Sequence, residues 1–128
     1  MIKLVFPWFN PVLNPNVKKF YMVKAKAQKS QKNEWYFLTK KQLPIVPEMA
    51  TVKKNLTVQK TAEGIELSIT YYPPDKKRRD KDNCKAAIKG GLDGLALAIG
   101  IDDRYFSYGY ERNGEAREGG EIEIEIKF

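Results

Sequence analysis

Two closely spaced aspartates follow a run of cations in the middle of the chain. Asp80 and Asp82 stand directly behind four basic residues, Lys76, Lys77, Arg78 and Arg79. In an extended chain the side chains of residues i and i+2 point the same way, so both carboxylates can hold one ion between them. A further pair, Asp102 and Asp103, comes later in the chain. Carboxylates from separate elements can hold the metal ions that phosphodiester hydrolysis uses to polarise phosphate and generate hydroxide.

The composition decides which metal such a site would take. The chain has no histidine and a single cysteine, Cys84, which removes the commonest general base near neutral pH and the usual zinc ligands. Serine triads, histidine-metal finger nucleases and zinc fingers are therefore excluded. Oxygen ligands select hard ions, so we expect Mg²⁺ or Mn²⁺.

The same spacing is also compatible with a structural role for every one of these residues. Asp80 and Asp82 can balance the basic run, with Asp82 capping a following helix, and Asp102 and Asp103 can form a polar turn. A basic run is often only a solvated face. The aspartates and the basic run together favour the metal site more than either does alone, because cations beside acidic metal ligands suit the approach of a phosphate backbone.

Charge is distributed unevenly along the chain. The net charge is +7, with residues 1–60 carrying +10 and the remaining residues −3. This asymmetry predicts a basic binding surface separate from an acidic site, as in a protein that meets a polyanion. Lys18 and Lys29 are candidate phosphate contacts, because their spacing places them with Lys40 on one face of a predicted helix. A merely soluble helix face is the alternative.

The hydrophobic pattern predicts one α+β domain over residues 1–128, with a mixed sheet of about four or five strands and two main helices. The helices are expected at residues 17–41 and 82–99, the second with an apolar stripe at Cys84, Ile88, Leu92, Leu95 and Ile99. Strands are expected at residues 2–6, 56–60, 65–72, 104–110 and 121–127, with a hairpin joining 56–60 to 65–72.

Nothing in the sequence predicts a membrane span or a secretion signal. No stretch approaches the roughly 20 apolar residues that a spanning helix needs. A lone cysteine cannot form an internal disulfide, which fits a reducing compartment, so we expect a cytoplasmic protein. Cys84 is expected in the core, and core packing is favoured over base stacking for four aromatic residues, Trp8, Phe9, Trp35 and Tyr36.

Three ordered motifs resemble the RusA-like Holliday junction resolvases, a family of crossover junction endodeoxyribonucleases with phage-borne members. Arg78-Arg79-Asp80-Lys81-Asp82-Asn83 is similar to the family's Arg-Asp-x-Asp-Asn signature. Residues 89–95 resemble its Lys-x-x-x-Asp helix step, and residues 97–103 end on its Asp-Asp pair. The opening Phe6-Pro7-Trp8-Phe9-Asn10-Pro11, with Asn14-Pro15-Asn16 behind it, is similar to the family's start. Across residues 17–70 the resemblance is loose.

This resemblance implies a magnesium-dependent endonuclease that cuts Holliday junctions or other branched DNA as a homodimer, in a bacterial cell or encoded by a phage. Two-fold symmetry suits paired cuts in a four-way junction. By position, Asp80, Asp82 and Asp103 correspond to the metal-binding carboxylates, and Asp102 to a helper.

The family's catalytic lysine corresponds to Lys89, which precedes Asp93 by four residues. The gap between Asp82 and Lys89 is longer than in the best-known members, and Lys85 lies one turn earlier on the same side of the predicted helix. Either lysine could stabilise the charge of the reacting phosphate.

Two other functions compete with this interpretation. One is a noncatalytic, basic nucleic-acid-binding accessory protein in which the aspartates are structural. The other is a restriction-type nuclease, because Pro74-Asp75 and Glu125-Ile126-Lys127 match a loose Pro-Asp…Glu-x-Lys pattern. That match is weak, since the glutamates of residues 121–125 alternate with isoleucines and are more simply the wet face of a strand.

Overall fold

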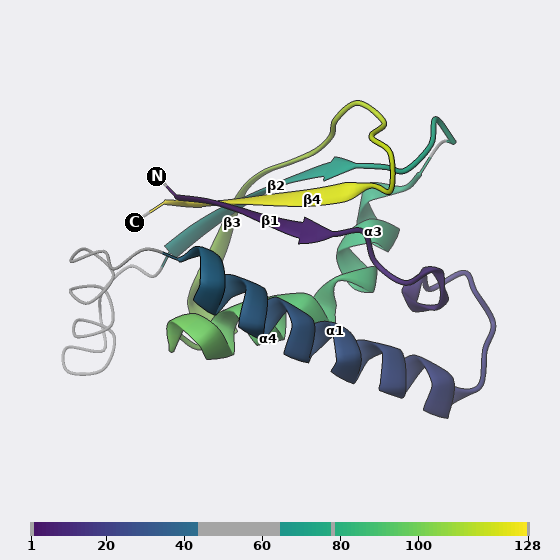
Figure 1. The fold of residues 1–128 in the computed structure, drawn as a ribbon, viewed down its shortest axis with the longest axis horizontal. Helices are drawn as coiled ribbons and strands as arrows, with labels where there is room; N and C mark the ends of the chain where they lie inside the picture. The colour runs from purple at the N-terminus through teal and green to yellow at the C-terminus, as the bar shows by residue number, and fades with distance from the viewer. Residues whose placement is uncertain (1, 44–64, 78, 128) are drawn as a thin grey trace.

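Four strands form one mixed sheet in the part of the chain that the computed structural model describes, residues 2–43, 65–77 and 79–127 (Figure 1). They are β1 (Ile2–Pro7), β2 (Ile65–Tyr72), β3 (Phe106–Asn113) and β4 (Glu121–Lys127), in the spatial order β1-β4-β2-β3. β4 is antiparallel to both neighbours, whereas β2 and β3 are parallel. A parallel pair needs a crossover connection, which the intervening helices provide.

The alternating pattern of β4 determines which face of the sheet is covered. Ile122, Ile124 and Ile126 are fully buried, and the glutamates between them face the opposite side. Ile124 lies opposite Leu4 on β1 and Ile69 on β2, which are also fully buried. The hydrophobic core therefore lies on one face of the sheet.

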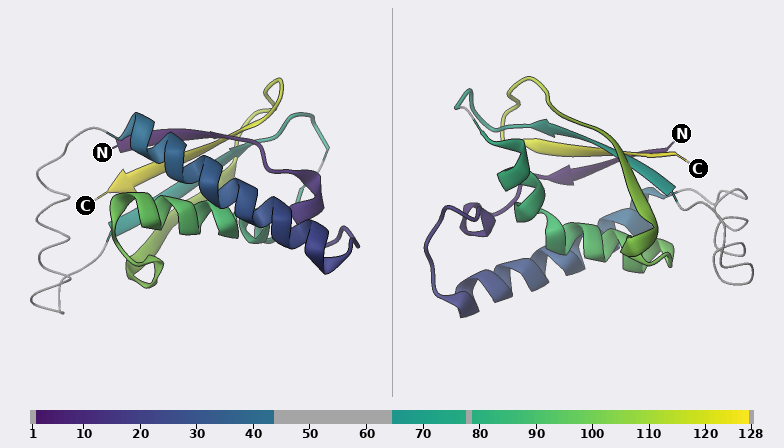
Figure 2. Two further views of the ribbon diagram at one scale, coloured as in Figure 1. Left: turned by 60° about the horizontal axis from the view of Figure 1, so that its bottom comes forward. Right: turned by 180° about the vertical axis from the view of Figure 1, so that it is seen from behind.

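Helices cover that face (Figures 1 and 2). α1 (Tyr21–Gln42) and α4 (Lys89–Ile99) pack against each other, and the shorter α3 (Lys81–Ala87) contacts both α4 and β3. Two single turns, η1 (Pro11–Leu13) and η3 (Asp103–Tyr105), precede α1 and β3. α4 buries Leu95 and Ile99 completely, and burial of each such side chain contributes about 1.5–3 kcal/mol.

Glycines allow α1 and α4 to approach closely. Gly90 lies against Gln28 and Gly94 against the backbone of Lys32, so the two helices run in the same direction. A Cβ atom at Gly94 would collide with the carbonyl oxygen of Lys32. Glycine has a low helix propensity, and the close packing of α4 on α1 explains why α4 nevertheless contains glycines.

Trp35 and Gln31 complete the contact between α1 and the rest of the domain. Trp35 is fully buried and stacks on Phe6, with ring centroids 4.0 Å apart. The Gln31 Nε2 donates to the Ala87 carbonyl oxygen at 3.2 Å, and its Oε1 accepts from the Gly91 amide at 2.9 Å. Gln31 therefore joins the end of α3 to the start of α4.

The structure confirms the α+β class with a mixed four-stranded sheet, and beside the two longer helices α1 and α4 the described ranges contain a third, short helix, α3. The helix expected at residues 82–99 is interrupted at Ile88, whose φ of −103° and ψ of 11° end α3 before α4 begins. Gln31 holds the backbone on both sides of this break, which sequence periodicity cannot reveal.

Other element boundaries also differ from the sequence expectations. α1 begins at Tyr21, so Lys18 precedes the helix and does not share a helical face with Lys29 and Lys40. The strand expected from residue 104 begins at Phe106, because η3 occupies the preceding residues. The strand expected at residues 56–60 lies outside the described residues.

The burial of single residues matches expectation for Cys84, Phe9 and Trp35, whereas Trp8 and Tyr36, also expected in the core, are only half-buried. Cys84 is buried, and its burial raises the pKa of the thiol. Phe9 and Trp35 are core residues as expected. None of the helices in the described ranges combines the length and apolarity needed to span a bilayer.

Candidate active site

Asp80 and Asp82 begin α3 but have different roles. Asp80 is the N-cap: its backbone is extended, and its Oδ1 accepts a hydrogen bond from the Asp82 amide at 2.8 Å. This contact satisfies one of the amides that every helix start leaves without a partner. Asp82 lies in the first turn, and its side chain lines a pocket that does not include Asp80.

That pocket, of about 350 Å³, opens between α3, α4, η3 and β3. Its lining combines three carboxylates, two lysines and an apolar wall, contributed by Asp82, Lys85, Ala86, Lys89, Leu92, Asp93, Asp103 and Tyr108. Carboxylates that are separated in sequence therefore share one cavity. Lys89 stands exposed in the first turn of α4, beside the same cavity.

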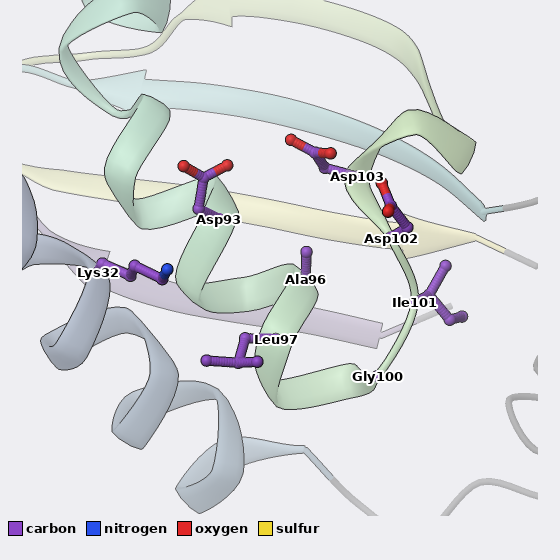
Figure 3. A pocket seen from close by; sticks show the side chains of 8 residues that line it. All are labelled: Lys32, Asp93, Ala96, Leu97, Gly100, Ile101, Asp102 and Asp103. Carbon is purple, nitrogen blue, oxygen red and sulfur yellow. The ribbon is translucent and has the colours of Figure 1, made fainter.

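Asp93 and Asp103 face each other between this pocket and a second one of about 370 Å³ (Figure 3). Figure 3 shows their carboxylates turned toward each other from α4 and from η3. Desolvation raises the pKa of Asp103, and the neighbouring Asp102 and Asp93 raise it further. The pair holds adjacent negative charges whose repulsion a bound cation would relieve.

Asp102 lines only the second of these two pockets, together with Lys32 from α1. Its Oδ1 accepts a hydrogen bond from the Arg104 amide at 3.0 Å, so that Asp102 caps η3. The hydrogen bond from this amide lowers the pKa of Asp102. Like Asp80, it fixes the backbone that carries its neighbour.

A bulge in β3 brings Tyr108 to the pocket and Glu111 to an ion pair with the pocket residue Lys85. Tyr108 pairs with Leu67 and Glu111 with Ile69, so the register shifts between them and both side chains face the helices. The Lys85 Nζ lies 3.0 Å from the Glu111 Oε1 and 3.5 Å from the centroid of the Tyr108 ring. Lys85 is therefore held in place by β3.

The carboxylates of the first pocket are the candidate ligands for the expected hard metal ion. Within the described ranges, no group of three or more His, Cys, Asp or Glu side chains is arranged to hold a metal ion. The chemistry of the donors nevertheless fits Mg²⁺ or Mn²⁺, because all three carboxylates of the pocket supply oxygen. Asp93 and Asp103 are within hydrogen-bonding reach of each other, and Asp82 lines the same pocket.

The predicted DNA-binding residues fall into separate places. Lys76 and Lys77 are exposed beyond β2, and Lys18 and Lys29 are exposed before and along α1. Arg78 lies outside the described residues. The Arg79 Nη1 lies 2.8 Å from the Asp75 Oδ1, and its guanidinium lies over the Trp8 ring, so Arg79 stabilises its own loop.

The residues of the restriction-type pattern are not brought together. Asp75 lies in the loop after β2, where it pairs with Arg79. Glu125 lies on the exposed side of β4 and forms an ion pair with Lys3 of 3.5 Å. Tyr72, at the end of β2 near Asp75, pairs with Glu121 on β4. Glu125 lies four residues further along β4, about 13 Å from that pair.

Sequence reasoning missed Asp93, Tyr108 and Glu111 as site residues. Asp93 carried a usable signal, because four residues separate it from Lys89 and place both on one side of a helix. Glu111 carried none: strict alternation from Tyr108 would place it on the opposite face, and the bulge reverses this.

Comparison with known proteins gives a relative but no described family. No family model matches the chain. An uncharacterised protein of Xylella fastidiosa (strain Temecula1) is 31% identical over 127 residues, which are 98% of this chain and 76% of the relative. The chain therefore belongs to the same family as this uncharacterised Xylella fastidiosa protein.

Proposed function

We propose that the protein is a magnesium- or manganese-dependent endodeoxyribonuclease that cuts Holliday junctions or other branched DNA in recombination, repair or phage replication. One observation carries the proposal: Asp82, Asp93 and Asp103 line a single pocket with Lys85 and Lys89. Carboxylates beside cations are what a site needs to hold hard ions and still admit a phosphate backbone.

The pocket residues would have different roles in phosphodiester hydrolysis. A bound divalent ion would supply Lewis-acid polarisation of the phosphate and an activated water. Asp82, Asp93 and Asp103 would hold it. Lys89 is exposed at the pocket and would stabilise the phosphate charge. Lys85 is less suited to this role because it forms an ion pair with Glu111. Asp80 and Asp102 are positioning residues that cap the elements carrying Asp82 and Asp103.

The basic N-terminal part of the chain supports DNA as the substrate. Residues 1–60 carry +10, and phosphate contacts supply most nonspecific affinity for DNA. Two copies related by a two-fold axis would place two pockets on one junction, so we propose a homodimer. Action on chromosomal or phage DNA would place the protein in the cytoplasm.

A second function is favoured by one observation, the lack of a ready-made group of three ligands among the described residues. In that case the protein is a noncatalytic, basic nucleic-acid-binding accessory protein, and Asp80, Asp82, Asp102 and Asp103 serve as helix caps and turn residues.

Cleavage of a labelled four-way junction with Mg²⁺ or Mn²⁺, by the parent and by substituted proteins, separates these functions. Asp82→Asn, Asp93→Asn and Asp103→Asn should each lower the rate roughly a hundredfold to a thousandfold, and Lys89→Ala to a similar degree. Junction affinity in the absence of metal should stay equal or rise, because each Asn removes a negative charge near the phosphates.

Asp75→Asn and Glu125→Gln are matched controls, since both remove a carboxylate outside the pocket, and they should cut at nearly the parent rate. Full activity in excess EDTA would contradict the metal requirement. A folded Asp82→Asn protein that cuts at the parent rate would contradict the assigned site. Tight junction binding without cleavage in any divalent metal would establish the accessory function.

A further inference from the structure

The start of α1 carries a cluster of exposed hydrophobic side chains, here named the apolar tip (residues 20–23). Phe20 is 85% exposed, Tyr21 82% and Met22 75%, and Val23 is also exposed. Apolar residues in such a position normally find a partner, because a monomer seldom leaves adjacent large hydrophobic side chains in water. None of the four is needed for the core cluster.

The apolar tip projects beyond the helix that packs beside it. Gly90, near the start of α4, lies level with Gln28 of α1, so the turns of α1 before Gln28 extend past that contact. Figure 2 shows these first turns reaching out from the body of the domain. The Lys24 Nζ donates to the Asn14 carbonyl oxygen at 3.3 Å and ties the helix start to the preceding loop.

The charge around the apolar tip selects the partner. Residues 1–33 contain no Asp or Glu, and six lysines surround the tip and continue along the helix, at Lys18, Lys19, Lys24, Lys26, Lys29 and Lys32. The tip residue Phe20 caps α1 without a side-chain hydrogen bond, so the first amides also favour an anion. A second copy would bring like charges together, whereas a nucleic acid would bring opposite ones.

Aromatic rings combined with cations are the usual means of binding unpaired nucleotides, because the rings stack on bases while the cations follow the phosphates. We infer that Phe20 and Tyr21 of the apolar tip stack on unpaired bases of the DNA whose backbone reaches the acidic pockets. The inference rests on the proposed function for the identity of the ligand as DNA.

The geometry of α1 links the apolar tip to the site. Tyr21 and Lys32 are eleven residues apart, which is close to three full turns, so they lie on nearly the same face. Lys32 lines the second pocket together with Asp93 and Asp103, and Figure 3 shows it on the α1 side of α4, with Asp103 on the other side. The separation along the axis is about 16 Å, or roughly five nucleotide rises of 3.4 Å. The stacked base should therefore lie about five nucleotides from the phosphate at the pocket.

Binding measured in EDTA tests stacking apart from cleavage. The probes are a duplex, the same duplex with a bulge of unpaired thymidines, and a bulge that carries 2-aminopurine, whose fluorescence reports stacking. Phe20→Ala/Tyr21→Ala should weaken binding to the bulged DNA roughly fivefold to a hundredfold for each stacked base lost. Duplex binding should stay within about twofold, and the 2-aminopurine signal of the parent complex should be lost.

Two further variants identify the interaction. Phe20→Leu/Tyr21→Leu keeps apolar bulk without a ring and should lose the stacking signal as the alanine variant does. Phe37→Ala is the matched control, because Phe37 is a similarly exposed ring (68%) on the same helix, far from the tip. It should bind both DNAs like the parent. Because all four tip positions are exposed, thermal stability should not change.

The outcomes also separate this inference from the proposed function. If the parent cuts junctions but the alanine variant binds bulged DNA as tightly as the parent, the inference fails and the nuclease stands. If the bulge is bound through the tip but nothing is cut, the nuclease fails and the inference stands. If sedimentation shows that the alanine variant turns a dimer into a monomer with unchanged DNA affinity, the tip is an interface between copies and the inference is wrong.

Discussion

At the scale of single residues, Asp103 links the acidic pocket to the pH of the solution. Desolvation and two neighbouring carboxyl groups raise the pKa of Asp103, which means that the folded protein holds this proton more tightly than the unfolded chain. Such a group contributes its full stabilisation of the folded state below its pKa in the unfolded chain, 3.8. This stabilisation is lost as the pH rises through the pKa of the folded state.

It follows that Asp103→Asn should make the metal-free protein slightly more stable at neutral pH. The substitution removes a carboxylate that is charged beside others, and the increase in Tm should be a few degrees at most, because the group is largely solvated. The gain should disappear below about pH 3.8, where the parent group is protonated in both states. Thermal melts in EDTA across pH measure this.

Asp75→Asn provides a control of opposite sign. The hydrogen bond from Arg79 lowers the pKa of Asp75, so its charged form favours folding above its usual value and this contribution is lost as the pH falls. Neutralising Asp75 should lower the Tm at neutral pH. If both Asn variants shift Tm in the same direction, the repulsion assigned to Asp103 is not the cause.

The site could be predicted residue by residue only where the relevant information is local. Asp82 and Asp103 were expected and do line one pocket, but Asp80 was expected there too and instead caps α3. Capping and ion binding use the same side-chain oxygens, so sequence spacing cannot choose between them. Glu111 depends on a shift of strand register and could not be predicted.

At the scale of elements, the contact between α1 and α4 determines where the site lies, because α4 carries Asp93 and α1 carries Lys32. The helices approach until the Gly94 position leaves no room for a Cβ atom against the Lys32 carbonyl. A backbone atom cannot rotate away as a side chain can, so this distance is fixed by the glycine.

Gly94→Ala therefore tests two opposed effects. Helix propensity alone would make alanine more favourable by about 1 kcal/mol, whereas overpacking against a backbone costs typically 1–3 kcal/mol or more. We expect a net loss of roughly 1–2 kcal/mol in the free energy of unfolding, measured by urea denaturation. Leu97→Ala on the same helix, where the side chain is 61% exposed, should cost much less. A stabilised Gly94→Ala protein would show that the helices can separate without cost.

Element boundaries illustrate why the fold was more predictable than its details. β4 follows its alternation, because burial on one face imposes a period of two. β2 also lies where its alternating pattern predicts a strand, although its polar residues Ser68 and Thr70 are buried as well. The break at Ile88 arises from Gln31, which is distant in the sequence and holds Ala87 and Gly91. Interactions between distant segments of this kind leave no periodic signal within the segment they bend.

At the scale of the whole molecule, the lysine-bearing helix α1 and the acidic pockets belong to one body, because α1 packs directly on α4. Replacing Lys18 and Lys29 by Gln should flatten the slope of log K against log salt for duplex DNA by up to about two units. Fluorescence anisotropy at several salt concentrations gives the slope. Replacing Lys3 and Lys127 instead is the control, since Lys3 is paired with glutamates, and an equal flattening would mean that binding is not localised on α1.

The order of strands across the sheet has a consequence for biosynthesis. β4 lies between β1 and β2 and joins them, yet of the described strands it is the last to be translated. A nascent chain that has already produced every aspartate of the pockets still lacks the strand that closes the sheet beneath them. Long-range pairing of this kind forms late and slowly. A ribosome-bound chain would thus carry the acidic residues before the scaffold that gathers them exists, so the proposed nuclease activity would begin only after residues 121–127 leave the ribosome.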